Sequence, residues 1–321
     1  SAVNQRLITV LLLLNALFVG NAGVRQAQAG KSHVSEKQLV IIDTDIGDDI
    51  DDAFAIGLAL QSPEFKLLGI TTAFGDTKLR AQLAVRLLAA TGHEGIPVVA
   101  GIQTPPRAKF SQAQYAESGD PKLVHPGTAP DFILDEIRKH PDQITLIAIG
   151  PQTNLGAAID KDPATFRRLK RIVMMGGSIY RGYNGDSPQA EWNILCDIPA
   201  AQKVFSSGVP LYVMPLDATI LKLDEAKRKA LFDYGSPLTA QLKELYQEWG
   251  QPTPTLFDPM AVSYAAKPEL CPTTALHITV DDKGFTRPGP GAPNAQACLK
   301  SDPDAFFQFL LGRLMSAAPV R

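Results

Sequence analysis

Cysteine is scarce in this chain of 321 residues. Only Cys196, Cys271 and Cys298 are present, and they lie too far apart for a disulfide scaffold or for a zinc site of the CxxC type. An oxidising compartment would allow one bridge, and the odd count would then leave at least one thiol free. The cysteines therefore exclude two kinds of architecture and carry no functional assignment of their own.

An excess of basic residues is also missing. Lys and Arg number 31 against 33 Asp and Glu, which gives a formal net charge of -2. Proteins that bind nucleic acid or anionic lipid usually carry a basic excess or a basic stripe, so we expect no nucleic-acid partner. With 45% hydrophobic and 20% charged residues, the chain can fill a large core and does not have the composition of a disordered protein. A small-molecule partner fits this balance best.

Long apolar runs are absent beyond the first residues. Residues 7–19 are apolar apart from two polar residues, and an Ala-Gln-Ala site that ends at Ala29 follows. This order is typical of a secretory signal peptide. An uncleaved anchor fits less well, because ~13 residues fall short of the ~20 that span a bilayer. We expect residues 1–29 to be a signal peptide and residues 30–321 to form a single domain, periplasmic or secreted and free of the membrane.

Short apolar runs recur along the rest of the chain and predict strands at residues 39–42, 67–72, 96–100, 144–149, 172–175 and 211–214. These runs are continuous rather than alternating, as expected of parallel strands that are buried on both faces. Amphipathic stretches between them predict helices at residues 51–61, 79–91, 131–139, 153–159 and 199–206. Repeated β-α units of this kind predict an α/β fold with an open, mostly parallel, Rossmann-like sheet and helices on both faces.

The pattern becomes mostly helical after about residue 220, with helices predicted at residues 223–232, 237–249, 259–266 and 304–315. Residues 277–299 are rich in Pro and Gly and predict a pair of strands joined by a long loop. In open α/β folds, ligands bind beyond the carboxyl ends of the strands. Functional residues are therefore expected directly after each apolar run.

Six aspartates fall within the ten residues 43–52, directly after the first predicted strand. Carboxylates this close stay ionised together only when a cation compensates them, and oxygen ligands suit calcium or magnesium rather than zinc. An acidic first helical turn would explain Asp49, Asp51 and Asp52, but it gives no reason for Asp43 and Asp45 at the end of a buried strand. A metal site is the better interpretation, and a metal-dependent phosphatase with a strand-DxD start is an open alternative.

The segment 43–53 resembles the opening motif of the inosine-uridine-preferring nucleoside hydrolase family. Five later segments resemble further motifs of that family in the same order, at residues 69–75, 148–154, 174–177, 190–193 and 257–261. The resemblance extends over most of residues 38–315 and implies calcium-dependent hydrolysis of the N-glycosidic bond of ribonucleosides to free base and ribose. It also implies a homo-oligomer, either a dimer or a tetramer.

The resemblance implies a role for each matched residue. Calcium would be bound by the side chains of Asp45, Asp52 and Asp258 and by the main-chain carbonyl of Thr153. Asp45 would also be catalytic, because it would deprotonate the water molecule that attacks C1′. Asp43 would orient Asp45 from behind. On the residues alone, Thr153 is explained equally well as a helix cap.

Further polar residues would hydrogen-bond the sugar. By position in the motifs they are Asp51, Asp76, Asn184, Glu191 and Asn193, with Asp49 as an alternative to Asp51. Three departures from the family pattern affect this set. Two extra residues between Gly47 and Asp51 leave the register of the aspartate loop open, Asp76 stands where many members have Asn, and the segment before Glu191 is one residue longer than usual.

A further departure concerns the leaving base. Phe257 occupies the position where many members carry a histidine, and none of the five histidines falls in a matched motif. Without a dedicated acid, turnover should depend steeply on the pKa of the leaving group, unless Tyr183 or Tyr264 supplies the proton. Two rival functions are a periplasmic nucleoside- or sugar-binding protein without turnover and a metal-dependent phosphatase. Neither predicts the later Thr153, Glu191 and Asp258 pattern.

Overall fold

The computed structural model describes residues 35–316. The predicted signal peptide, residues 1–29, lies outside this part of the chain. Within residues 35–316, no helix combines the length and the apolar character that crossing a bilayer would require.

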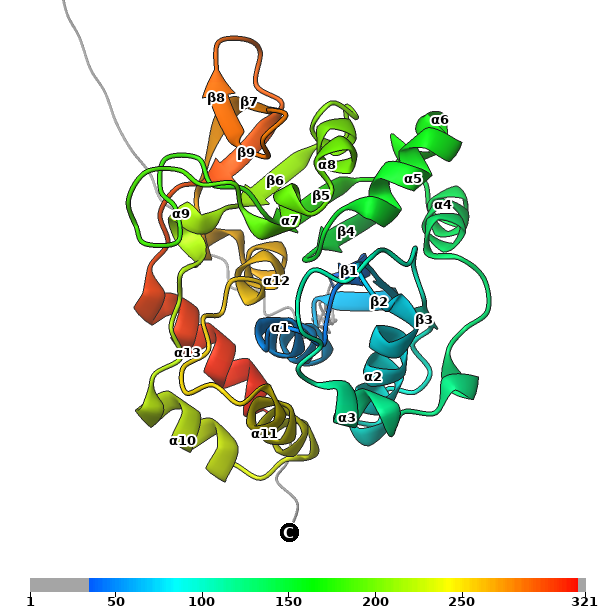
Figure 1. Ribbon diagram of the computed structural model, residues 1–321, viewed down its shortest axis with the longest axis vertical. Coiled ribbons are helices and arrows are strands. Elements are labelled where there is room, and N and C mark those ends of the chain that lie inside the picture. The colour runs from blue at the N-terminus through cyan, green and yellow to red at the C-terminus, as the bar shows by residue number, and fades with distance from the viewer. Residues whose placement is uncertain (1–34, 317–321) are drawn as a thin grey trace, which may run out of the picture. The chain divides into compact units, whose positions relative to one another are not determined.

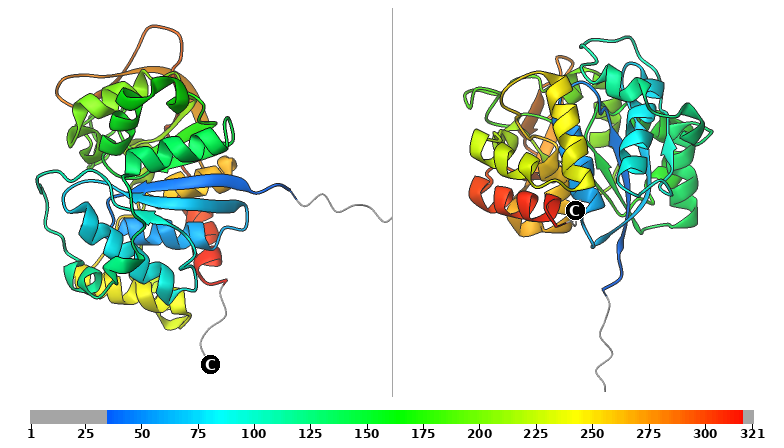
Figure 2. Two further views of the ribbon diagram at one scale, coloured as in Figure 1. Left: turned by 90° about the vertical axis from the view of Figure 1, so that its right-hand side faces the viewer. Right: turned by 90° about the horizontal axis from the view of Figure 1, so that it is seen from below.

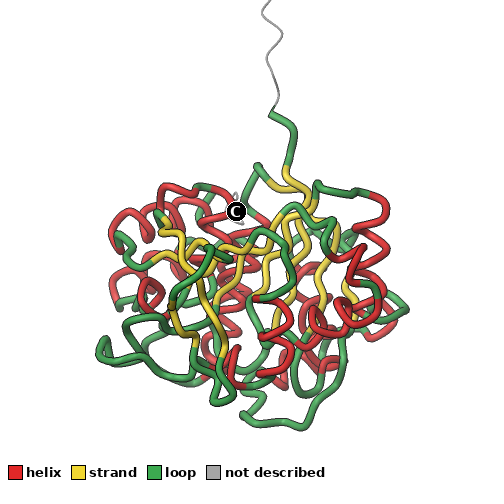
Figure 3. The backbone as a smooth tube through the Cα atoms, turned by 90° about the horizontal axis from the view of Figure 1, so that it is seen from above, coloured by secondary structure: helices red, strands yellow, loops and turns green. Residues whose placement is uncertain are grey.

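A nine-stranded sheet forms the centre of the domain (Figures 1 and 3). Its strands are β1 (Gln38–Thr44), β2 (Phe65–Thr72), β3 (Val98–Val99), β4 (Ile144–Ala148), β5 (Arg171–Met175), β6 (Leu211–Met214), β7 (Thr273–Val280), β8 (Thr286–Gly289) and β9 (Ala295–Cys298). The order across the sheet is β3-β2-β1-β4-β5-β6-β9-β7-β8. All neighbours from β3 to β9 pair parallel, and β7 pairs antiparallel with both β9 and β8. The predicted fold class is confirmed.

Helices cover both faces of the sheet, as the left-hand view of Figure 2 shows. They are α1 (Asp51–Leu60), α2 (Thr77–Ala90), α3 (Ala113–Glu117), α4 (Ala129–Lys139), α5 (Thr153–Lys161), α6 (Pro163–Phe166), α7 (Trp192–Leu195), α8 (Ile198–Phe205), α9 (Leu216–Thr219), α10 (Glu225–Asp233), α11 (Pro237–Trp249), α12 (Pro259–Ala266) and α13 (Pro303–Leu314). Each predicted helix is present, with ends that differ by at most two residues.

The continuous apolar runs are explained by two hydrophobic cores, one on each side of the sheet. Val40 and Ile42 of β1 pack into the core that also contains residues of α1, α2 and α12. Ile41, between them, packs into the core shared with α4, α5 and α8. Successive side chains of a strand point to opposite faces, so a strand that is buried on both sides has no polar face.

The prediction of a strand pair joined by a long loop over residues 277–299 is wrong. The segment contributes to three strands: β7 and β8 form an antiparallel hairpin, and β9 inserts between β6 and β7. Pro288 and Gly289 suggested a loop, but they lie in β8, at the edge of the sheet. An edge strand tolerates proline because one side of its backbone needs no ladder partner. The disulfide Cys271–Cys298 links the segment just before β7 to the end of β9. Cys196 is a free thiol.

Candidate active site

A cavity of about 750 Å³ opens at the carboxyl ends of the central strands. Asp45 follows β1, Ile149 follows β4, Met175 ends β5 and Asp258 precedes α12, and all four line the cavity. The strand order reverses between β1 and β4, because β2 and β3 lie on one side of β1 and β5 and β6 lie beyond β4. Open α/β sheets bind ligands at this switch point, where the loops diverge to opposite faces.

The turn between β1 and α1 is held in place by the side chain of Arg80 from α2, which is 2% exposed. The guanidinium group of Arg80 donates to the carbonyls of Asp45 (2.8 Å) and Ile46 (3.1 Å) and forms two hydrogen bonds to the carboxylate of Asp48 (3.0 and 2.9 Å). At Gly47, φ is +128°, and a Cβ there would lie 2.4 Å from the ring of Phe110. The extra residues of this loop are therefore fixed by a largely buried ion pair and a glycine.

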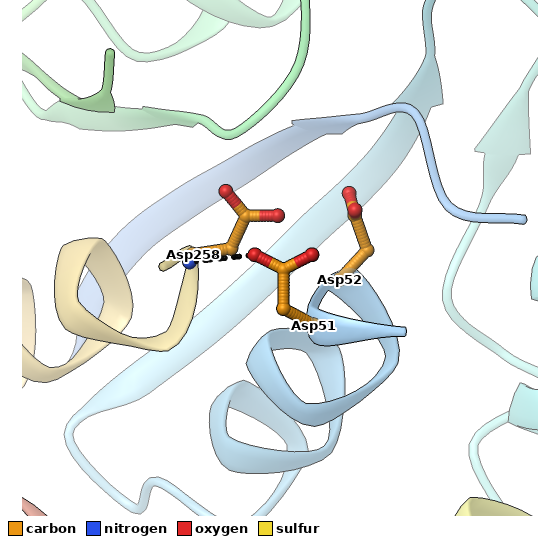
Figure 4. Close-up of side chains that lie close together, drawn as sticks. All are labelled: Asp51, Asp52 and Asp258. Carbon is orange, nitrogen blue, oxygen red and sulfur yellow. Dashed lines mark hydrogen bonds between the residues drawn. The ribbon is translucent and has the colours of Figure 1, made fainter. Parts of the chain in front are cut away.

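Figure 4 shows that Asp51, Asp52 and Asp258 meet at the start of α1. One carboxylate oxygen from each lies within 4.8 Å of the others, and all three side chains are buried. The backbone N–H of Asp258 donates to Asp51 (3.0 Å), and the hydroxyl of Thr44 donates to Asp52 (2.6 Å). Residues from the first and last thirds of the domain thus build one acidic cluster.

Asp45 lines the cavity beside this cluster and is 8% exposed. A Cβ at Gly150 would lie 3.1 Å from Oδ1 of Asp45, so a glycine is needed where the ends of β1 and β4 approach each other. We call Asp45, Asp51, Asp52 and Asp258 the acidic end of the cavity. Asp48 is bound by Arg80, so it is not part of this set.

Burial dominates the electrostatics of the acidic end. It raises the pKa of Asp52 to about 7, and repulsion from Asp51 adds to this effect. Burial followed by repulsion between neighbouring carboxylates also holds the pKa values of Asp45, Asp51 and Asp258 well above the ordinary range. A divalent cation would remove this penalty by compensating the negative charges. The all-oxygen donor set suits a hard ion.

Glu191 and Asn193 form another part of the wall. Glu191 is 2% exposed, and its carboxylate accepts hydrogen bonds from the backbone N–H groups of Gly177 (2.9 Å) and Asn193 (2.8 Å). Burial raises the pKa of Glu191 to about 7 in spite of these bonds. The side-chain amide of Asn193 donates to the carbonyls of Met175 (3.0 Å) and Ile149 (3.4 Å). Both residues are thereby oriented at the predicted sugar site.

Known proteins identify the chemistry of this site. The family model of the inosine-uridine preferring nucleoside hydrolases matches residues 40–308. The chain belongs to this family. The pyrimidine-specific ribonucleoside hydrolase RihA of Citrobacter koseri is 33% identical over 309 residues, which cover 86% of this chain and 97% of the relative. An uncharacterized protein of Schizosaccharomyces pombe is also 33% identical, over 86% of this chain and 98% of its own length.

Solved structures of nucleoside hydrolases share the fold. A plant nucleoside hydrolase superposes with a TM-score of 0.80 and 26% identity, over 88% of this chain and 100% of that one. The purine-preferring ribonucleoside hydrolase of Gardnerella vaginalis gives a TM-score of 0.76 and 25% identity, over 87% and 98%. The protein is therefore an N-glycosyl hydrolase that acts on ribonucleosides, and the sequence-based identification is confirmed over the rival binding protein and phosphatase.

Four residues predicted for the hydrolase site do not line its cavity. Asp76 is exposed and caps α2 by accepting from the N–H of Leu79 (3.0 Å). Asn184 is exposed and lines a neighbouring hollow. Thr153 lies in the first turn of α5, where its hydroxyl donates to Asp197 (2.7 Å). The residue of this motif that does line the cavity is Ile149, which directly follows β4.

Asp43 is the fourth predicted site residue that does not line the cavity. It is fully buried, and it accepts from Thr71 (2.6 Å) and Asn154 (2.8 Å). Thr71 is its register partner on β2, which explains why these bonds join β1 to β2 and α5. None of the hydrogen bonds that Asp43 makes within residues 35–316 reaches Asp45, so its predicted orienting role would act through the backbone. Its Oδ2 is buried without a partner in this part of the chain.

Four aromatic side chains form a further part of the wall of the hydrolase cavity, and the motifs indicated only some of them. The aromatic wall consists of Tyr183, Trp192, Trp249 and Phe257. The rings of Tyr183 and Phe257 meet edge to face, with 6.2 Å between their centroids. Asp49 also lines the cavity, although its carboxylate accepts from the N–H of Ile50 (2.8 Å).

Proposed function

We propose that this hydrolase is calcium-dependent and that Asp45, Asp52 and Asp258 of the acidic end bind the ion. The support is the buried group of Asp51, Asp52 and Asp258, whose carboxylate oxygens lie within 4.8 Å of one another. Calcium accepts six to eight oxygen ligands in flexible geometry, and Asp45 would supply a further one. A bound cation would chelate ribose hydroxyls and favour ionisation of a coordinated water.

We also propose that the main-chain ligand is the carbonyl of Ile149. In the sequence this role was predicted for Thr153. Ile149 lines the cavity, and its carbonyl accepts only a long hydrogen bond from Asn193 (3.4 Å). Thr153 lies beyond the cavity in the first turn of α5. A carbonyl at the switch point of the sheet is available to a ligand there, whereas a carbonyl in a helix is directed along the helix axis.

The side chains of the cavity divide the reaction between them. Asp45 accepts a proton from the water that attacks C1′, because its carboxylate lines the cavity beside the acidic cluster. Asp51, Glu191 and Asn193 hold the sugar by hydrogen bonds. The negative charge of the acidic end stabilises the positive charge that develops on the ribose ring as the glycosidic bond breaks.

The test is a panel of purine and pyrimidine ribonucleosides scored for free ribose, with and without a chelator. Both groups belong in the panel because similar proteins include a pyrimidine-specific and a purine-preferring hydrolase. We expect ribose release that is lost on chelation and is restored by calcium more effectively than by magnesium. Full activity in metal-stripped protein with excess chelator would refute the metal dependence. For variants that replace an aspartate of the acidic end by asparagine, the matched control is Asp135→Asn, at an exposed position on α4.

We further propose that the protein is exported. The predicted signal peptide motivates this proposal, and the disulfide Cys271–Cys298 supports it, because disulfides persist in oxidising compartments. Fractionation of cells and sequencing of the mature N-terminus provide the test. We expect the protein outside the cytoplasm with Gly30 as its first residue. A cytoplasmic protein that retains residues 1–29 would contradict the proposal. The predicted dimer or tetramer is checked by light scattering.

A further inference from the structure

The departing base meets no histidine in this cavity. By the motif resemblance, Phe257 stands where many members of the family carry a histidine; it lines the cavity, and none of the histidines within residues 35–316 contributes to the wall. A base that leaves as an anion needs a hydrogen-bond donor at the atom where the charge develops. The candidates for such a donor are the other residues of this wall that the sequence indicated.

Two tyrosines were candidates in the sequence, and the structure separates them. Tyr264 is 6% exposed and lies in the core, where its ring packs against Tyr212 with 5.4 Å between the centroids. Tyr183 lines the cavity, and its ring is in edge-to-face contact with Phe257. Tyr183 is thus the tyrosine whose ring contacts the side chain at the histidine position.

The hydrogen bonds of Tyr183 leave its proton available. The backbone N–H of Trp192 donates to the hydroxyl oxygen of Tyr183 (3.0 Å). A phenolic hydroxyl can accept and donate at the same time, and within the described residues its own proton has no acceptor. Burial, aided by the charge of Glu191, raises the pKa of Tyr183, which keeps the hydroxyl protonated at neutral pH.

The loop that carries Tyr183 is internally bonded, which fixes the position of the ring. The backbone N–H of Tyr183 donates to the side chain of Gln189 (2.7 Å), and Gly182 N–H donates to the carbonyl of Asp186 (3.0 Å). The N–H of Gln189 in turn donates to Ser178 (3.1 Å). The residue is therefore held in the cavity wall although 39% of it is exposed.

We propose that Tyr183 donates a hydrogen bond to the departing base, a role that rests on the proposed hydrolysis of nucleosides. As the bond from C1′ to the base nitrogen breaks, its electron pair passes to the base, and Tyr183 stabilises the resulting negative charge. The attacking water adds its hydroxide to C1′ and gives its proton to Asp45. The base takes up a proton from solvent, and Asp45 returns one to solvent, so that Tyr183 keeps its own.

The experiment compares Tyr183→Phe with wild type on inosine, uridine and p-nitrophenyl riboside. We expect kcat for the two nucleosides to fall about 10²-fold, the effect of removing one donor from a developing anion. Hydrolysis of the aryl riboside should change less than about 3-fold, because p-nitrophenolate leaves without assistance. Tyr264→Phe, which removes a hydroxyl outside the cavity, should leave all three rates unchanged.

A merely structural role of Tyr183 predicts a different pattern. Loss of the bond to Trp192 would disturb the cavity for every substrate, so equal losses on nucleosides and aryl riboside would overturn the assignment. Unchanged rates on all three would overturn it as well. In the Tyr183→Phe background, Phe257→His should recover at least about 10-fold in nucleoside turnover by supplying a replacement donor. Wild-type protein that cleaves none of the three substrates would instead refute the proposed function.

Discussion

The acidic end and the aromatic wall are built in opposite ways. The four carboxylates of the acidic end are at most 8% exposed, and the loop before them is fixed by Arg80. In the aromatic wall, Tyr183 is 39% exposed and belongs to a surface loop. The reaction at C1′ is the same for every ribonucleoside, whereas the bases differ. Burial and charge are therefore concentrated at the acidic end, where the chemistry is the same for every substrate. The aromatic wall, which would face the variable base, is more exposed at Tyr183.

The largest effect should follow from Asp45→Asn at the acidic end. We expect kcat to fall about 10³–10⁴-fold, since an amide can still ligate weakly but cannot accept the proton of the attacking water. The fold should persist, as judged by circular dichroism and thermal unfolding. A loss of only a few-fold would show that another carboxylate is the base.

Unfolding in urea tests whether the contacts of the aspartate loop contribute more to stability than those of the Tyr183 loop. Arg80→Met should lower the free energy of unfolding by about 3–5 kcal/mol, because it leaves the largely buried carboxylate of Asp48 and the carbonyls of Asp45 and Ile46 without their donor. Gln189→Ala, which removes a hydrogen bond in the loop of Tyr183, should cost about 1 kcal/mol or less. Asp48→Asn should recover part of the loss in the Arg80→Met background. Equal costs at Arg80 and Gln189 would remove the contrast between the two regions.

The register of the aspartate loop is sharpened by a matched pair of variants. Asp51→Asn should lower kcat/KM for nucleosides about 10²-fold, because the carboxylate of Asp51 belongs to the acidic cluster. Asp49→Asn should lower it less than about 10-fold, because the carboxylate of Asp49 bonds its neighbour Ile50. The reverse order of effects would assign the sugar contact to Asp49.

The smallest effect concerns pH in metal-stripped protein. Burial raises the pKa of Asp52 from 3.8 to about 7, so folding favours its protonated form. This stability is fully present below pH 3.8 and is lost as the pH rises through about 7. Without metal, the melting temperature should therefore fall by a few degrees from pH 5 to pH 8. Calcium should raise it most at pH 8, and a flat profile would show that Asp52 is ionised throughout.

Several parts of this structure could be predicted from residues alone. The strands β1 to β6 were predictable because burial on both faces leaves continuous apolar runs. Asp45, Asp52 and Asp258 were predicted from the family resemblance of their motifs, and the structure places all three in one cavity wall. β8 was missed because Pro288 and Gly289 disfavour a strand locally, although an edge position tolerates them.

Arg80 is the main residue of the site that sequence reasoning missed. An arginine in an amphipathic helix usually faces solvent, and nothing in residues 77–90 distinguishes it. The available signal lay elsewhere: the extra aspartates of the loop require a compensating charge. Asp76 was predicted at the sugar, but local geometry makes it the cap of α2. Such choices depend on contacts far along the chain, which a motif does not contain.

Asp51 and Asp258 are hydrogen-bonded but lie 207 residues apart in the sequence, so they are synthesised at different times. At about 5–20 residues per second, a ribosome needs roughly 10–40 s to add the stretch between them. During that interval the emerging chain has the first aspartates but not the last, so it cannot assemble the complete acidic end. Until Asp258 has been added and has folded against α1, the growing chain cannot carry out any step that needs all four carboxylates.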